Sequence, residues 1–315
     1  MTSKRRSLEL LQEALIECRR CDRLVAWREE VARVKRRAYR DETYWGRPIP
    51  GFGDPDAKLI LMGLAPAAHG GNRTGRMFTG DRSGDFLYAA LHRAGVASQP
   101  TSIRRGDGLT LTGAFIVAPC RCAPPENKPT PAELAACRPW LEAELALLDQ
   151  AHTYLALGKT GYDAVLTLAK KHGDVSGAPA FAHGARGEIP DPRGSGGRAW
   201  LFGSYHVSQQ NTQTGRLTAA MFDEVLGAAP RRDALLARLF QRCPGPRGGC
   251  PPLDPDQARP GPKVEELRDA QFFQRARGKT MEVGFKQATC TLPVEPAALP
   301  CWLAGPSPVL SAAVR

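Results

Sequence analysis

A short apolar run followed by a long glycine-rich loop most constrains how this chain of 315 residues can fold. The run, residues 58–62, has the composition of a buried parallel strand, and a helical pattern begins near Ser83. The loop between them is too long for a plain connection, and long ordered loops in compact domains are usually functional. Open α/β sheets bind their ligands beyond the carboxyl ends of such strands. The sequence therefore predicts a binding site at this loop.

The same order of strand, polar loop and helix recurs along the first 230 residues. Further apolar runs at residues 114–118, 154–157 and 199–202 predict three more strands, with helical patterns between them. Four strands that alternate with helices are typical of an α/β fold, in which helices cover both faces of a parallel sheet. Residues 173–198, rich in Gly and Pro, predict an irregular hairpin.

The composition changes near residue 230. Residues 231–315 hold 12 of the 27 prolines and show no clear hydrophobic periodicity. We therefore expect a folded domain at residues 1–230 and a disordered, basic, Pro/Gly-rich tail at residues 231–315.

The net charge of +11 indicates an anionic partner, nucleic acid first. A basic surface without a partner is the alternative. No run of 18 apolar residues is present, so we expect no contact with a membrane interior. The N-terminal stretch lacks the apolar centre of a secretory signal, which predicts a cytoplasmic protein.

Nine cysteines in a protein expected to be cytoplasmic indicate metal ligands or free thiols rather than disulfides. Cys18 and Cys21 form a CxxC motif at the end of a predicted helix. Cys122 and Cys137 lie before and within another predicted helix. Four thiolates suit tetrahedral zinc and a four-iron cluster equally well. Cys120 is a rival ligand for Cys122, and buried free cysteines are the alternative to a metal site.

Two polar side chains after predicted strands are candidates for catalysis. Asp81, in the glycine-rich loop, can act as a general base or as a fixed anion that stabilises positive charge. Its structural alternative is the cap of the helix that begins near Ser83. His206 follows the last strand and can stabilise an anion on a leaving group, whereas a core histidine bonded to a carbonyl is the structural alternative.

An aromatic residue and several cations in the loops suit a ligand that has a flat ring and phosphates. Phe78 can stack on a nucleobase or belong to the core. Three loops at the same predicted sheet edge carry the cations Arg73, Arg76, Lys128 and Arg216. These cations either contact phosphates or are ordinary solvated charges.

Three motifs together resemble the uracil-DNA glycosylase superfamily, and within it the type-B, or fifth, family. They are GLAPAAHGGNRTGRMFTGD at residues 63–81, CAPPENKPTPAEL at 122–134 and SYHVSQQNTQTGRLT at 204–218. The likeness covers about residues 10–228. It implies a three-layer αβα sandwich with a central four-stranded parallel sheet. It also implies a monofunctional DNA repair glycosylase that hydrolyses the N-glycosidic bond of uracil and leaves an abasic site.

The resemblance implies catalytic roles for three residues. Asn127 would position the base or the attacking water, Asp81 would align that water and balance charge on the sugar, and His206 would donate to the departing base. The target base would first flip out of the duplex, at a cost of about a few kcal/mol. The implied base-binding residues are Gly63, Leu64 and Phe78.

The resemblance also implies a partner and a cofactor. The partner is double- or single-stranded DNA that contains deaminated bases, and the segment 208–216 would enter the minor groove. Gln210 stands at the wedge position where many members of the superfamily have leucine. The implied DNA contacts are Arg73, Arg76, Ser208, Gln210, Asn211 and Arg216. The implied cofactor is a [4Fe–4S] cluster on Cys18, Cys21, Cys122 and Cys137, in a protein that we expect to be a monomer.

The first motif lacks the polar side chain that many members of the superfamily carry at residues 65–68. Its absence is typical of the type-B family and implies that hypoxanthine and other deaminated bases are accepted with uracil. A catalytically weak DNA-binding lesion sensor on the same fold is the alternative function. A zinc-dependent nucleic-acid protein is a more distant one.

Overall fold

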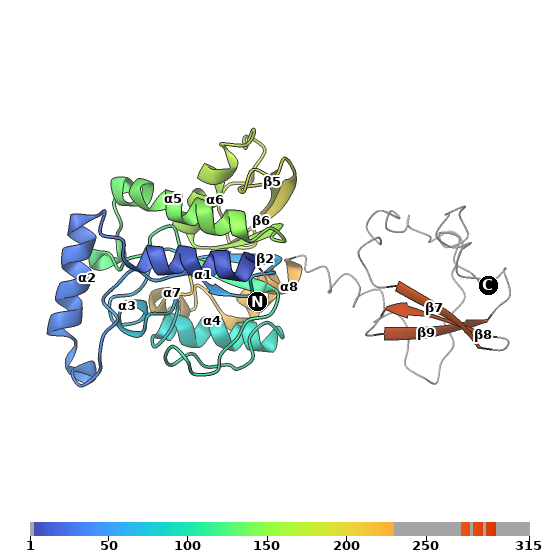
Figure 1. Cartoon of the computed structure of the whole chain (residues 1–315), viewed down its shortest axis with the longest axis horizontal. Coiled ribbons are helices and arrows are strands. Elements are labelled where there is room, and N and C mark those ends of the chain that lie inside the picture. The colour runs from blue at the N-terminus through green and yellow to red at the C-terminus, as the bar shows by residue number, and fades with distance from the viewer. Residues whose placement is uncertain (1–2, 230–271, 278–279, 286–287, 294–315) are drawn as a thin grey trace. The chain divides into compact units, whose positions relative to one another are not determined.

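Four parallel strands form the centre of a six-stranded sheet in the computed structural model. The model describes residues 3–229, 272–277, 280–285 and 288–293 (Figure 1). The chain divides into two units, Met1–Leu235 and Leu236–Arg315. The central strands of the first unit are β2 (Leu59–Met62), β3 (Ala114–Val117), β4 (Thr153–Leu157) and β6 (Arg198–Ser204).

Two short antiparallel strands extend the predicted sheet at its edges. β1 (Phe52–Gly53) pairs with β3, and β5 (Arg186–Pro190) pairs with β6, which gives the order β1-β3-β2-β4-β6-β5. The central four-stranded parallel sheet is confirmed. The hairpin predicted within residues 173–198 is formed instead by β5 and β6, so only one of its two strands lies in that stretch.

Helices lie on both faces of the sheet, which confirms the αβα sandwich (Figure 1). One core contains side chains of α1 (Ser3–Ile16), α5 (Pro131–Leu147) and α6 (Lys159–Ala169). The other contains side chains of α4 (Arg82–Arg93) and α8 (Ala219–Ala228). The remaining helices of this unit are α2 (Asp22–Val34), η1 (Arg37–Tyr39), α3 (Gly71–Thr74), η2 (Pro125–Asn127) and α7 (Gln209–Gln213).

The continuous apolar run of β2 is explained by burial on both faces. Leu59 and Leu61 belong to one core, and Ile60 and Met62 belong to the other. Successive side chains of a strand point to opposite faces, so a strand covered by helices on both sides needs apolar residues throughout.

The second unit contains a described three-stranded antiparallel sheet of its own. Its strands are β7 (Phe272–Arg277), β8 (Thr280–Phe285) and β9 (Ala288–Pro293). They differ from the expectation of a tail without regular structure. The prolines of the tail cluster at residues 244–262 and 293–308. The stretch between these two clusters contains no proline and has residues that favour strands, which the composition averaged over the whole tail did not reveal. The rest of residues 231–315 lies outside the described residues, and the domain boundary near 230 stays a prediction.

Within the described segments, no helix combines the length and the hydropathy needed to cross a membrane.

The core assignment predicts a large stability loss for Leu155→Ala. This side chain of β4 is fully buried, so its truncation should lower the free energy of unfolding by about 2–5 kcal/mol. Leu10→Ala is the control, because Leu10 is 48% exposed and its truncation should change stability by no more than about 0.5 kcal/mol. Urea unfolding followed by circular dichroism measures both, and equal losses would contradict the assignment.

Candidate functional site

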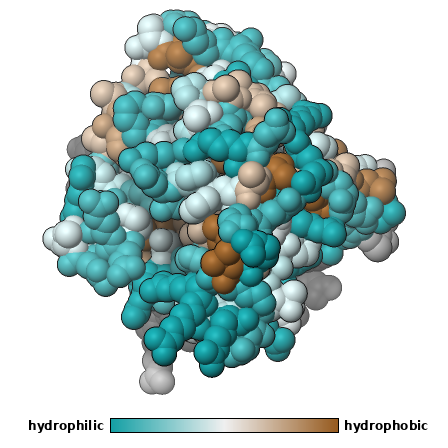
Figure 2. Space-filling view, turned by 90° about the vertical axis from the view of Figure 1, so that its left-hand side faces the viewer, coloured by the Kyte–Doolittle hydropathy of each residue, from teal (hydrophilic) through white to brown (hydrophobic). Residues whose placement is uncertain are grey.

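The strands β3, β2, β4 and β6 run parallel to one another in this order. The loops that follow β2, β3 and β6 therefore lie at the same edge of the sheet. The three sequence motifs therefore converge in space. The side of the molecule that bears α2 and α3 faces the viewer in Figure 2. It is mostly hydrophilic, with small, separate hydrophobic patches.

Asp81 caps α4 and is half-buried. Its Oδ1 accepts a hydrogen bond from the backbone N of Gly84 at 2.9 Å. Burial raises the pKa of the Asp81 carboxyl, and the backbone N–H groups of Gly84 and Ser83 offset only part of that rise. Asp81 therefore does cap the helix, as the structural alternative predicted, and it does so through Oδ1. The geometry around the second oxygen, Oδ2, is set by Gly70.

Gly70 makes room for that second oxygen. A β-carbon on Gly70 would lie 1.9 Å from Oδ2 of Asp81, which no side chain could tolerate without displacing the carboxylate. A β-carbon on Gly84 would likewise lie 1.9 Å from the carbonyl oxygen of Phe78. Sequence analysis missed both glycines as parts of the site. Gly70 lies in the glycine-rich loop eleven residues before Asp81, and Gly84 lies in the first turn of α4, where a glycine is unfavourable without such a reason.

Phe78 has a left-handed backbone, with φ 50°, which is rare for a bulky residue. Such conformations persist only where the surroundings hold them, and they gather at functional sites. A β-carbon on Gly63 would lie 3.1 Å from the Phe78 ring, so the ring rests against the end of β2. The rings of Phe78 and His206 lie 6.2 Å apart, which brings the first and third motifs together.

His206 is a neutral imidazole at neutral pH because burial lowers its pKa to about 4. It packs against Gly158, where a β-carbon would lie 3.1 Å from Cβ of His206. The side chain of Asn211 donates to the His206 carbonyl oxygen at 2.8 Å. Ser208 caps α7 by accepting from the backbone N of Asn211 at 3.5 Å. Asn211 and Ser208 therefore position the His206 loop, a role that the sequence did not reveal.

Asn127 has a left-handed backbone, with φ 57°, and an exposed side chain at the end of η2. It lines a groove of about 410 Å³ together with Leu64 and residues of α5 and α6. The second motif is thereby brought beside the first. Asp81, Phe78 and His206 are not among the residues that line this groove.

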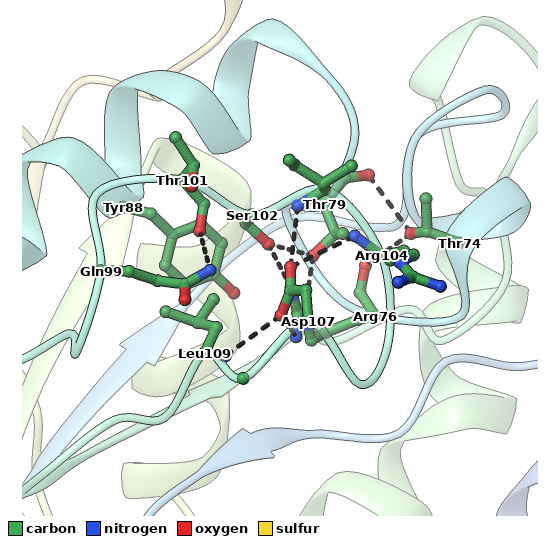
Figure 3. Close-up of polar contacts among 12 residues, drawn as sticks. Thr74, Arg76, Thr79, Tyr88, Gln99, Thr101, Ser102, Arg104, Asp107 and Leu109 are labelled. Carbon is green, nitrogen blue, oxygen red and sulfur yellow. Dashed lines mark hydrogen bonds and ion pairs between the residues drawn. The ribbon is translucent and has the colours of Figure 1, made fainter.

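Arg76 is buried and bonded to protein groups, which corrects the expectation that it contacts DNA. Its side chain is 5% exposed. Its guanidinium donates to both carboxylate oxygens of Asp107, at 2.8 and 2.6 Å, and also to Ser102 and Thr79 (Figure 3). The donors that a phosphate would need are therefore already engaged.

Arg73 is corrected for the same reason. It is 8% exposed and forms an ion pair with Glu42. It also donates to the carbonyl oxygens of His69 and Gly80, both at 2.8 Å, and its guanidinium lies 3.9 Å from the ring centre of Tyr39. Arg73 therefore closes the loop from residue 69 to residue 80.

Gln210 and Arg216 remain available to a partner. Both side chains are exposed, on α7 and just after it. The guanidinium of Arg216 lies 4.8 Å from the ring centre of Tyr205. The positions of these two residues are compatible with the DNA contacts that the sequence predicted.

The four predicted metal ligands line one small cavity, together with Cys120. Cys18, Cys21, Cys122 and Cys137 come from the ends of α1 and α2, the loop after β3 and α5, and all are free thiols. Within the described residues, no group of three His, Cys, Asp or Glu side chains is placed to hold a single metal ion. The five cysteines therefore lie together, while the part of the chain that the structure describes contains no metal-binding group.

A family model described as "Uracil DNA glycosylase superfamily" matches residues 50–229, more than half of the chain and all three motif loops. The chain belongs to this superfamily. A type-5 uracil-DNA glycosylase of Thermus thermophilus is 55% identical over 223 residues, which cover 71% of this chain and 97% of that protein. A type-5 uracil-DNA glycosylase of Mycobacterium tuberculosis is 54% identical over 215 residues, 68% of this chain and 77% of the relative. These similarities confirm the fifth family of the uracil-DNA glycosylase superfamily.

A relative from Pyrobaculum aerophilum, also a type-5 uracil-DNA glycosylase, is 42% identical over 221 residues, 68% of this chain and 88% of its own length. A type-4 uracil-DNA glycosylase of Thermotoga maritima is 33% identical over only 113 residues, 36% of this chain and 50% of its own length. The type-5 members match far more of the chain.

The burial of His206 predicts a pH-dependent stability. The unfolded chain takes up a proton near pH 6.5, whereas the folded chain does so only near pH 4, so stability falls as pH drops through that window. The contribution is about 2–3 kcal/mol between pH 7 and pH 4.5. Urea unfolding of wild type and His206→Gln at both pH values measures it. An identical pH dependence of the two proteins would contradict a buried neutral imidazole.

Proposed function

We propose that this uracil-DNA glycosylase superfamily member excises uracil from DNA by hydrolysing the N-glycosidic bond, and that it leaves an abasic site. The observation that carries the proposal is the contact between the rings of Phe78 and His206, whose centres lie 6.2 Å apart and which bring the first and third motifs together. Asp81 follows Phe78 by three residues in the first motif. The type-5 relatives, with 51–55% identity, support uracil as the substrate.

The extruded base lies against Phe78 in this proposal. Flipping takes the target base out of the stack, and the cost is smallest for a mispaired base such as deaminated cytosine. Backbone groups near Gly63 and Leu64 bind the edge of the base. Asn127 positions the base or the attacking water from the wall of the adjoining groove.

Asp81 and His206 act on opposite charges in the transition state. The bond between the sugar C1′ and the base nitrogen breaks, so that the base departs as an anion and the sugar gains positive charge. Water bonds to C1′, and the proton that the water loses neutralises the released base. The carboxylate of Asp81 aligns the water and stabilises the sugar, and a neutral His206 donates a hydrogen bond to the departing base. A neutral donor suits this step because it is already dry and oriented when the anion forms.

The accepted bases include hypoxanthine and other deaminated bases. The segment 65–68 carries no polar side chain that would reject them, as the sequence shows. Ser208, Gln210, Asn211 and Arg216 form or support the segment that approaches the minor groove. The monomeric state and the cytoplasmic location stay predictions.

Asp81→Asn tests the mechanism. The amide keeps the size of the side chain but removes the negative charge, so single-turnover release of uracil should fall by about 10²–10³. Asp85→Asn is the matched control, because Asp85 lies exposed in the first turn of the same helix. It should release uracil at the wild-type rate.

A uracil-containing duplex, cleaved by alkali after release, measures both variants. If Asp81→Asn kept full activity, the proposed role of the carboxylate would be lost. If the wild-type protein bound the duplex but released no base, the chain would be a lesion sensor.

We also propose a [4Fe–4S] cluster on Cys18, Cys21, Cys122 and Cys137. Four cysteine thiolates would hold such a cluster, one to each iron. The proposal is supported by the cavity that these four cysteines line together, since it gathers thiols from three separate parts of the chain. When bound, the cluster would link the N-terminal helices to the loop after β3.

Arg28 fits the chemistry of that donor set. It is 2% exposed, and its Nη1 donates to Sγ of Cys122 at 2.9 Å. Its Nη2 donates to the carbonyl oxygen of Cys18 at 3.2 Å. A buried cation beside the thiolates would stabilise the negative charge that they carry as ligands.

Cys137→Ser should lose the iron, the brown colour and the visible absorption of the protein, because it removes one of four ligands. Cys120→Ser should keep all three, since Cys120 lines the same cavity but lies outside the proposed ligand set. Iron content per chain and the absorption spectrum of anaerobically purified protein measure the effect. Stoichiometric zinc in a colourless wild-type protein would refute the cluster.

A further inference from the structure

The loop between α4 and β3 presents an apolar side chain beside the glycine-rich loop that carries Asp81, called here the catalytic loop (residues 63–81). Ile103 is 65% exposed, and the exposed Arg104 and Arg105 follow it. These three residues are called the 103–105 tip. An exposed aliphatic side chain followed by two exposed cations is unusual on a surface, and here it adjoins the loop that carries Asp81.

The 103–105 tip is held firmly by Asp107. One carboxylate oxygen of Asp107 accepts from the backbone N of Ile103 at 2.9 Å and of Arg104 at 3.3 Å. The other accepts from the backbone N of Leu109 at 3.1 Å. Figure 3 shows Asp107 between Arg104 and Leu109, with its carboxylate also paired to Arg76. The loop is therefore fastened at its base while Ile103 projects from it.

The residue before the 103–105 tip is bonded to the catalytic loop. The carbonyl oxygen of Ser102 accepts from the backbone N of Gly80 at 3.0 Å, and Gly80 directly precedes Asp81. The hydroxyls of Ser102 and Thr79 lie 2.6 Å apart. The tip is thus one residue away from a backbone contact with the catalytic loop.

The charge beside Ile103 matches an anionic strand. The guanidinium of Arg105 lies 4.5 Å from the ring centre of Trp45, which holds this cation at the surface. Arg82, directly after Asp81, is also exposed. Aliphatic and cationic groups side by side fit the sugars, base faces and phosphates of DNA.

We propose that the 103–105 tip contacts the DNA strand that carries the lesion. Ile103 packs against a base or sugar next to the extruded nucleotide, and Arg104 and Arg105 contact phosphates. This inference rests on the proposed function and adds a DNA contact outside the three motifs. It also supplies an apolar contact that the polar Gln210 does not provide.

Ile103→Ser tests the apolar contact without disturbing the core, because the side chain is exposed. We expect it to weaken binding to a duplex that contains a 2′-fluorinated deoxyuridine, whose glycosidic bond resists hydrolysis, by about 5- to 20-fold. Leu10→Ser is the matched control, an exposed aliphatic residue on α1, and it should bind like wild type. Fluorescence anisotropy measures the affinities.

Arg104→Gln tests the phosphate contact. The slope of log K against log salt should fall by about 1 relative to wild type, since one phosphate contact is lost. Fluorescence of 2-aminopurine beside the lesion gives a second readout. Its increase on binding should be smaller for Ile103→Ser than for Leu10→Ser if Ile103 packs into the strand.

The outcomes separate the two proposals. A wild-type protein that releases no uracil would remove the proposed function, while the binding comparison would still decide the role of the 103–105 tip. Equal affinity and equal fluorescence of Ile103→Ser and wild type would overturn the tip contact. If Ile103→Ser bound DNA like wild type but changed the oligomeric state in analytical ultracentrifugation, the tip contact with DNA would also be overturned. Ile103 would then belong to a contact between copies of the chain.

Discussion

The buried ion pair between Arg76 and Asp107 keeps the candidate site in shape. Burial alone would raise the pKa of Asp107, but hydrogen bonds from Arg76 and from backbone N–H groups lower it well below its usual range. Buried ions are costly unless hydrogen bonds satisfy them, and here both partners are extensively bonded. The pair joins the loop after β2 to the loop after α4. Thr79 and Gly80 of the first loop both form hydrogen bonds with Ser102 of the second, which fixes the backbone directly before Asp81.

The electrostatic arrangement of the site depends on burial rather than on opposite charges alone. Desolvation raises the pKa of Asp81 and lowers the pKa of His206, so each group is less readily charged than it is in water. Backbone N–H groups partly restore the charge of Asp81, whereas burial keeps His206 neutral. In the proposed mechanism Asp81 acts as the carboxylate that these N–H groups stabilise, and neutral His206 donates a hydrogen bond to the departing base.

The sequence predicted the central sheet well because strands covered on both faces must be apolar throughout, as β2 is. The start of α5 was also predictable, since Thr130 and Glu133 form a capping box around Pro131 at the first turn. Such signals are local. Each is complete within a few neighbouring residues.

The sequence failed where a side chain finds its partner far along the chain. Arg76 and Arg73 resembled free cations because nothing nearby reveals that Asp107 and Glu42 lie against them in the fold. The hydrogen bond from the Asn211 side chain to the His206 carbonyl oxygen could not be predicted either, because it forms only in the folded loop. The motifs therefore predicted which loops meet at this edge of the sheet, but they could not separate exposed side chains from those that are bonded within the fold.

Gly70 and Asp81 cannot vary independently. Because the space for one carboxylate oxygen is the space that a methyl group on Gly70 would occupy, any larger residue at position 70 is compatible only with a displaced or shorter side chain at position 81. Transplanting this acid into another scaffold would therefore require copying an empty volume eleven positions upstream as well as the carboxylate itself.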